Sequence, residues 1–123
     1  MMRFRNAIGG VGVALFLTSC GDCTLVGCLD GLEVQLDQRP TTAFRVEATS
    51  PDAGDQAVEC ASPGTCGVFF NAYRPTIVTL RVIRGADTVT TANVRPVYER
   101  LRPNGAGCPG DCRYGRVTAR APR

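Results

Sequence analysis

Seven cysteines are the residues of this chain whose type and spacing could do the most chemistry. Six of them form three close groups: Cys23 with Cys28, Cys60 with Cys66, and Cys108 with Cys112. Such groups can form disulfides, hold a tetrahedral zinc ion or carry out thiol redox reactions. The two terminal groups have four and three residues between their cysteines, unlike the CxxC spacing of zinc ribbons and redox pairs. The spacing therefore favours disulfides and predicts no bound metal.

Cys60 and Cys66 are the best single pair, because Pro63-Gly64 lies between them. Pro-Gly is typical of a type II turn, which would bring the two Cα atoms within the limit of about 7 Å for a disulfide. Closing so short a loop stabilises the fold by about 2 kcal/mol. The four terminal cysteines either pair locally, which the sequence slightly favours, or join the two chain ends, which would contribute about 4 to 5 kcal/mol.

The seventh cysteine, Cys20, ends an N-terminal segment that has the build of an export signal. Arg3 and Arg5 precede an uncharged apolar run over residues 7–17, which is too short to span a bilayer as a permanent helix. The sequence Leu17-Thr18-Ser19-Cys20 resembles the lipobox of bacterial lipoproteins. In that family the chain is cut before the cysteine, whose sulfur then carries a diacylglyceryl group. The resemblance therefore implies removal of residues 1–19 and lipidation of Cys20.

A lipid at Cys20 would tether the mature chain to a membrane. Each CH₂ group buried in the bilayer contributes about 0.8 kcal/mol to membrane binding. One acyl chain therefore binds the membrane reversibly, while two or three chains anchor a protein firmly. Gly21 stands where Asp commonly retains enterobacterial lipoproteins in the inner membrane, so the outer membrane of the cell envelope is the better expectation. The expected organisation is a removed signal at 1–19, a lipid-anchored tether at 20–30 and a single domain at 31–123.

The composition argues against most catalytic chemistry. All 14 basic residues are arginines, because the chain has no His and no Lys. Without His the usual general base and the commonest metal ligand are missing, and without Lys there is no Schiff-base chemistry. Removing Arg3 and Arg5 lowers the formal net charge from +3 to +1, which gives no argument for a nucleic-acid partner. We therefore predict no enzymatic activity, no cofactor and no nucleic acid.

Beyond the tether, apolar and polar residues alternate in short segments that are separated by turn signals. Strands are expected over residues 32–37, 44–48, 58–60, 67–71, 76–84, 88–97 and 113–121. Gly85-Ala86-Asp87 is typical of a hairpin loop, and Pro96 ends the sixth strand or places it at an edge. About seven strands with no helix predict an all-β, disulfide-stabilised fold, an antiparallel β-sandwich of Ig-like or transthyretin-like architecture.

Three arginines, Arg100, Arg102 and Arg113, are the candidate binding residues. They flank a Gly-rich segment that holds Cys108 and Cys112, and loops on rigid scaffolds commonly carry binding sites. Together they could meet an anionic group, or the loop 99–113 could bind a carbohydrate. The alternative, which the sequence favours, is a pinned connection with solvated arginines. Likewise, the arginines at 74, 81 and 84 indicate a polar sheet face more than contact with anionic lipid or polysaccharide.

A wider resemblance joins the two ends of the mature chain. Gly27-Cys28-Leu29-Asp30-Gly31-Leu32, and Pro103-Asn104-Gly105 with Cys108 and Cys112, are similar to the corresponding ends of a family of short bacterial lipoproteins. The resemblance implies a shared cysteine-stabilised β-domain and brings no ligand with it. We therefore expect a membrane-anchored, non-catalytic structural or interaction module, whose partner would be an envelope protein or a polysaccharide. Carbohydrate or anion binding through loop 99–113 is the alternative function.

Overall fold

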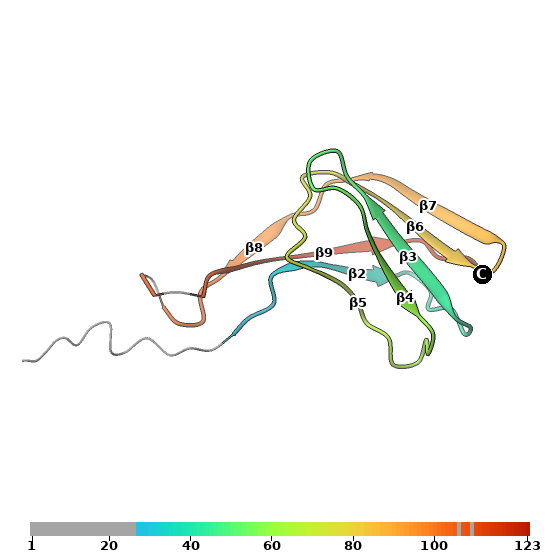
Figure 1. The fold of residues 1–123 in the computed structure, drawn as a ribbon, viewed down its shortest axis with the longest axis horizontal. Helices are drawn as coiled ribbons and strands as arrows, with labels where there is room; N and C mark the ends of the chain where they lie inside the picture. The colour runs from blue at the N-terminus through green and yellow to red at the C-terminus, as the bar shows by residue number, and fades with distance from the viewer. Residues whose placement is uncertain (1–26, 106, 109) are drawn as a thin grey trace, which may run out of the picture. The chain divides into compact units, whose positions relative to one another are not determined.

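The computed structural model describes residues 27–105, 107–108 and 110–123 (Figure 1). These residues fall into two units. One unit is a β-sandwich made of residues Leu29–Leu101 and Cys112–Arg123. The other unit includes Cys28 and the loop Arg102–Asp111. The predicted signal at 1–19 and the tether up to residue 26 lie outside the described residues. Within the described residues, no helix has the length and apolar character needed to cross a bilayer.

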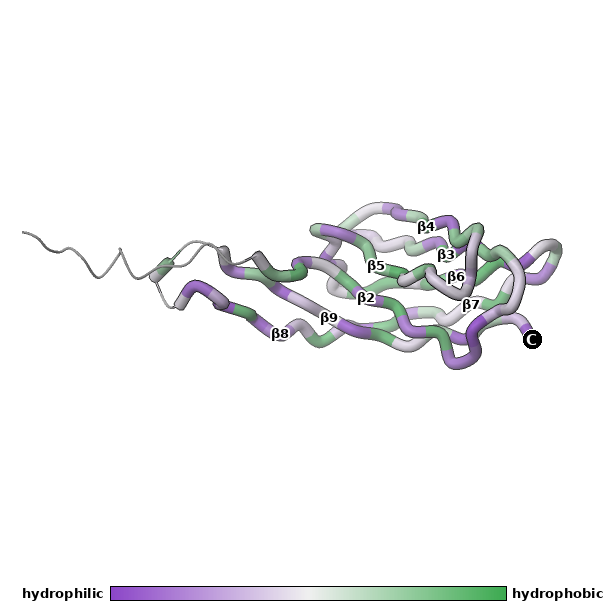
Figure 2. Tube along the Cα trace, turned by 90° about the horizontal axis from the view of Figure 1, so that it is seen from below, coloured by the Kyte–Doolittle hydropathy of each residue, from purple (hydrophilic) through white to green (hydrophobic). Residues whose placement is uncertain are grey.

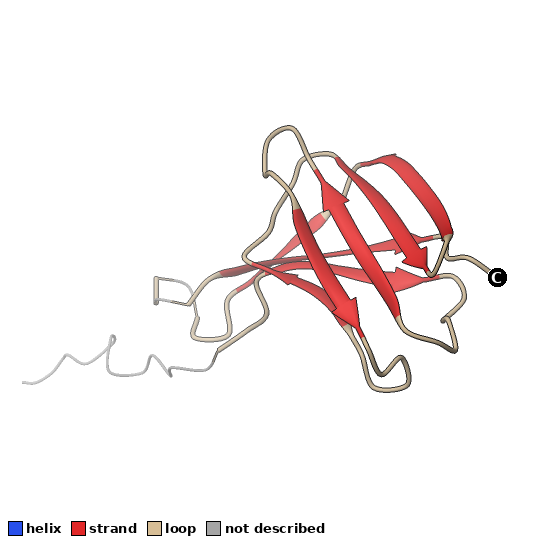
Figure 3. Ribbon diagram, turned by 45° about the vertical axis from the view of Figure 1, so that its right-hand side comes forward, coloured by secondary structure: helices blue, strands red, loops and turns tan. Residues whose placement is uncertain are grey.

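The sandwich consists of two sheets of four strands each (Figure 3), so the all-β sandwich prediction is confirmed. The strands are β2 (Gly31–Leu36), β3 (Phe44–Thr49), β4 (Gln56–Cys60), β5 (Val68–Asn71), β6 (Val78–Arg84), β7 (Asp87–Val94), β8 (Tyr98–Leu101) and β9 (Cys112–Ala119). Sheet one has the order β5-β2-β9-β8, and sheet two has the order β4-β3-β6-β7.

Alternation along the strands explains why the two sheets face each other. In β3, Phe44, Val46 and Ala48 are buried while the residues between them lie outward. Figure 2 shows hydrophobic and hydrophilic residues interspersed along the chain of the sandwich. Successive strand side chains point to opposite faces, so one face of each sheet enters the core. The core side chains come from both sheets and include Leu32, Val34, Val46, Phe70, Val78, Leu80, Val82 and Val117.

One strand pair departs from the antiparallel prediction. β2 runs parallel to β9, with Val34 opposite Val117, whereas every other pair of neighbouring strands is antiparallel. A parallel pair needs a long connection between its strands. Here that connection is the rest of the domain, because β2 and β9 are the first and last strands of the sandwich.

The strand prediction misses one element and shifts the ends of others. Residues 98–101, expected to begin a loop, form strand β8 and pair with β9. The strand expected over 88–97 ends at Val94, two residues before Pro96. Ser62 to Thr65 form a hydrogen-bonded turn, but Gly64 does not take the positive φ that the predicted type II turn requires.

Candidate functional site

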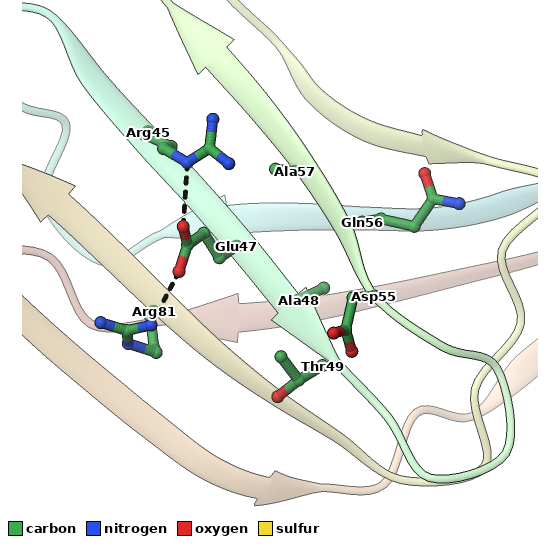
Figure 4. A pocket seen from close by; sticks show the side chains of 8 residues that line it. All are labelled: Arg45, Glu47, Ala48, Thr49, Asp55, Gln56, Ala57 and Arg81. Carbon is green, nitrogen blue, oxygen red and sulfur yellow. Dashed lines mark hydrogen bonds and ion pairs between the residues drawn. The ribbon is translucent and has the colours of Figure 1, made fainter.

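One hollow lies on the outer face of sheet two, with a volume of about 450 Å³ (Figure 4). Arg45 and Glu47 on β3, together with Arg81 on β6, line its polar side. Arg45 Nε donates to Glu47 Oε2 at 2.9 Å, and Arg81 Nη1 donates to Glu47 Oε1 at 2.8 Å. Arg45 also pairs with Glu59 on β4. Hydrogen bonds to Glu47 and then to Glu59 raise the pKa of Arg45.

This arrangement is a chain of compensated charges. Guanidinium groups occupy both carboxylate oxygens of Glu47. Because Arg45 also pairs with Glu59, the two arginines meet two carboxylates and bring no net charge to the hollow. Arg84 and Arg74 are likewise paired, with Asp87 at 3.6 Å and Asp30 at 3.5 Å. These contacts support the interpretation of Arg74, Arg81 and Arg84 as solvated polar surface. Exposed pairs of this kind add little to stability.

The candidate arginines of loop 99–113 separate into two groups. Arg100 on β8 lies directly opposite Arg113 on β9, so both belong to strands and not to the predicted loop. Cross-strand partners share one face of a sheet. Arg102 belongs to the loop unit, where its Nε lies 3.7 Å from Asp111 Oδ2. Arg100 and Arg113 are therefore neighbours across two strands. Arg102 is not part of this pair and instead contacts Asp111.

The cysteines of the described residues are in disulfides. Cys60 and Cys66 are bonded to each other, with their Cα atoms 5.6 Å apart, which is the pair that the sequence favours. Cys28, Cys108 and Cys112 are also disulfide-bonded, while Cys20 and Cys23 lie outside the described residues. A disulfide sulfur is not the thiolate that metal binding or nucleophilic chemistry requires.

Arg39 fixes the loop closed by Cys60 and Cys66. Its Nη1 donates to the carbonyl oxygens of Pro63 and Cys66 at 2.7 and 2.8 Å. We expect the double substitution Cys60→Ala with Cys66→Ala to lower the free energy of unfolding by about 2 kcal/mol, because the loop is then open in the unfolded chain. Urea unfolding measures this loss. The control Thr65→Ala keeps the bridge and should change stability by less than about 0.5 kcal/mol; a loss equal to that of the double variant would contradict the prediction.

Two aspartates, Asp52 and Asp37, accept hydrogen bonds from backbone N–H groups. Asp52 accepts hydrogen bonds from Ser50 Oγ at 2.5 Å and from the Thr76 backbone N–H at 3.0 Å. Asp37 accepts from the N–H of Ala121 at 3.1 Å. Among the described residues, no three Cys, Asp or Glu side chains converge to hold a metal ion. These carboxylates therefore tie together loops at the ends of the sandwich.

The hydrogen bonds of Asp52 predict a loss of stability in acid. Contacts with Ser50 and then Thr76 lower its pKa from 3.8 to about 2. The stabilisation is therefore complete above pH 3.8 and is lost as the pH falls through about 2. We expect Asp52→Asn to flatten the fall in Tm between pH 5 and pH 2, and Ser50→Ala to flatten it in part. A wild-type acid slope in Asp52→Asn would contradict this assignment.

The outer face of sheet one carries a group of side chains that the sequence alone does not bring together. We define this aromatic face as Leu29, Glu33, Phe69, Tyr114 and Arg116. The rings of Phe69 and Tyr114 are stacked, with centroids 6.3 Å apart and planes 21° from parallel. The Arg116 guanidinium carbon lies 5.7 Å from the centre of the Tyr114 ring. Outward strand positions were visible in the sequence, but the strand order that brings them together was not.

Comparisons with known proteins do not assign this chain to a family: no family model, no curated protein and no solved structure matches it.

Proposed function

We propose that this chain is a lipid-anchored protein of the bacterial cell envelope, with a non-catalytic β-sandwich that acts as an interaction module. The observation that carries the proposal is the export signal ending in Leu17-Thr18-Ser19-Cys20. The fold is compatible with such an anchor, because β2 begins at Gly31 and only residues 20–30 would separate it from the lipid. Disulfide-bonded cysteines support an oxidising compartment. The outer membrane is the favoured location.

Asp52 and Tyr98 have shifted pKa values that suit structural hydrogen bonds. Hydrogen bonds lower the pKa of Asp52 to about 2, and burial raises the pKa of Tyr98 to about 12. A general acid or base works best when its pKa lies near the operating pH. Both groups instead hold the fold together: the Tyr98 hydroxyl donates to the Pro75 carbonyl at 2.7 Å. These hydrogen bonds support a structural role for Asp52 and Tyr98.

Lipidation has a direct test in the native host. Wild-type protein should incorporate labelled palmitate, begin at Cys20 by mass spectrometry and stay with the membrane after washing in high salt. Cys20→Ala should incorporate no label and lose its lipid attachment. Ser19→Ala is the matched control, because it keeps a small residue before the cysteine and should behave as wild type. Native protein that begins at Met1 and carries no acyl chain would overturn the proposal.

A second candidate function is anion binding at Arg100 and Arg113. The observation that favours it is their direct pairing across β8 and β9, which places two guanidinium groups on one sheet face. Titration with inorganic phosphate and with a sulfated polysaccharide tests it. Binding should weaken with salt and fall in Arg100→Ala with Arg113→Ala, while Arg81→Ala retains it. Equal binding by the double variant and wild type would exclude this site.

A further inference from the structure

Leu29 and Phe69 form the apolar part of the aromatic face, which lies beside a hollow. Leu29, whose side chain is 58% exposed, and the partly exposed Phe69 belong to this surface. They line a hollow of about 320 Å³ together with Glu33, Gly67 and Val68. This volume lies at the small end of the range of ligand pockets. The hollow can therefore accept one small ring against the side chains of Leu29 and Phe69.

Strand pairing places the polar members of the aromatic face around Glu33. Glu33 lies opposite Phe69 on one side and opposite Arg116 on the other. Its Oε1 is 3.4 Å from Arg116 Nε, and Arg116 Nη2 donates to the Tyr114 hydroxyl at 3.2 Å. A carboxylate, a guanidinium and a phenol thus stand beside the apolar surface, where they offer both hydrogen-bond acceptors and donors.

The charge of this group selects the kind of ligand. Glu33 and Arg116 compensate each other, so the aromatic face presents no net charge to a ligand. A purely apolar partner would form no hydrogen bonds with these three polar groups. An ionic partner would have to displace either Glu33 or Arg116 from their ion pair. A neutral ligand with an apolar face and a rim of hydroxyl groups matches both features. Pyranose sugars have this character: the C–H face packs on an aromatic ring while the hydroxyls form hydrogen bonds.

We propose that the aromatic face binds one ring of a neutral polysaccharide, with the sugar packed on Phe69 and Leu29 and its hydroxyls bonded to Glu33 and Arg116. The Tyr114 ring stacks against the Phe69 ring and so holds the Phe69 ring in place. This proposal depends on the proposed function and specifies its partner, since an envelope interaction module needs a ligand outside the membrane. It uses a surface separate from Arg100 and Arg113. The outer face of sheet two offers a contrast, because its hollow contains no aromatic ring.

The test is calorimetric titration of the mature, lipid-bearing protein with neutral hexasaccharides: cellohexaose, xylohexaose, maltohexaose and N-acetylchitohexaose. At least one should bind, with affinity unchanged between low and high salt. Phe69→Ala should weaken that binding about tenfold or more, because the sugar loses its packing surface. Glu33→Gln should weaken it less. Arg81→Ala, on the opposite sheet, is the matched control and should bind as wild type does.

Each alternative occupant gives a distinct result. Failure to bind any of the four hexasaccharides would overturn the proposal, as would binding that Phe69→Ala leaves unchanged. Concentration-dependent dimers that Phe69→Ala abolishes would assign the surface to a second copy of this chain. Binding only to anionic polysaccharides, weakened by salt, would assign the ligand to the arginines. None of these results bears on lipidation at Cys20, so this proposal can fail while the anchor remains.

Discussion

Gly31→Ala should strongly destabilise the sandwich. A Cβ atom built at Gly31 would lie 2.1 Å from the carbonyl oxygen of Phe70, and the contact is with backbone that pairs β2 to β5. The φ of Gly31 is also +144°, a conformation that side-chain-bearing residues rarely adopt. Overpacking and backbone strain together should lower the free energy of unfolding by about 3 to 5 kcal/mol. Urea unfolding followed by circular dichroism measures the loss.

Gly64→Ala is the control for this substitution. Gly64 lies in the disulfide loop, has open space around its Cα and does not have a positive φ. Alanine there should be neutral or should stabilise by about 0.4 to 1 kcal/mol through the unfolded chain. If Gly31→Ala unfolded at the same urea concentration as Gly64→Ala, the close approach of β2 and β5 at this position would be contradicted.

Phe70→Ala should have the other large effect on stability. Phe70 is 2% exposed, and its ring contacts that of Tyr73 at a centroid distance of 5.6 Å. Truncation removes apolar contacts and leaves a cavity between the sheets, which costs about 3 to 5 kcal/mol for a buried Phe. The lost packing also loosens Tyr73, whose hydroxyl donates to the Gly54 carbonyl at 2.7 Å. Chemical unfolding again provides the measurement.

The adjacent Phe69 supplies a matched control. It has the same side chain on the same strand but points to the outer face of sheet one and stays partly exposed. Phe69→Ala should therefore cost far less, about 1 kcal/mol, mainly from the lost stacking with Tyr114. Equal losses for the two variants would contradict the assigned orientation of β5. A folded Phe69→Ala protein is also what the saccharide titration requires.

Local patterns predicted most of the strands but not their partners. Alternation in Phe44-Arg45-Val46 and in Val78-Thr79-Leu80 reports directly on which side chains enter the core. Gly85, with φ of +61°, begins the two-residue turn between β6 and β7 where a hairpin was expected. Strand β8 was missed because Glu99 and Arg100 both remain exposed, so the segment lacks the apolar alternation of a half-buried strand.

The sequence could not predict the aromatic face, for a different reason. Phe69 and Tyr114 belong to different strands, and only the order β5-β2-β9 places them over the same part of a sheet. Pairing over such separations depends on the packing of the whole domain, which no local pattern records. The separation of Arg102 from Arg100 was hidden for the same reason, because the strand that contains Arg100 was not recognised.

The parallel pairing of β2 with β9 also determines when the domain can fold. β9 lies between β2 and β8. Sheet one is therefore incomplete until residues 112–119 have emerged from the ribosome. Contacts between residues so distant in sequence give a high contact order, which slows folding. A nascent chain that ends before Cys112 would lack the strand between β2 and β8, which would leave one edge of β2 open and β8 without a neighbour in that sheet.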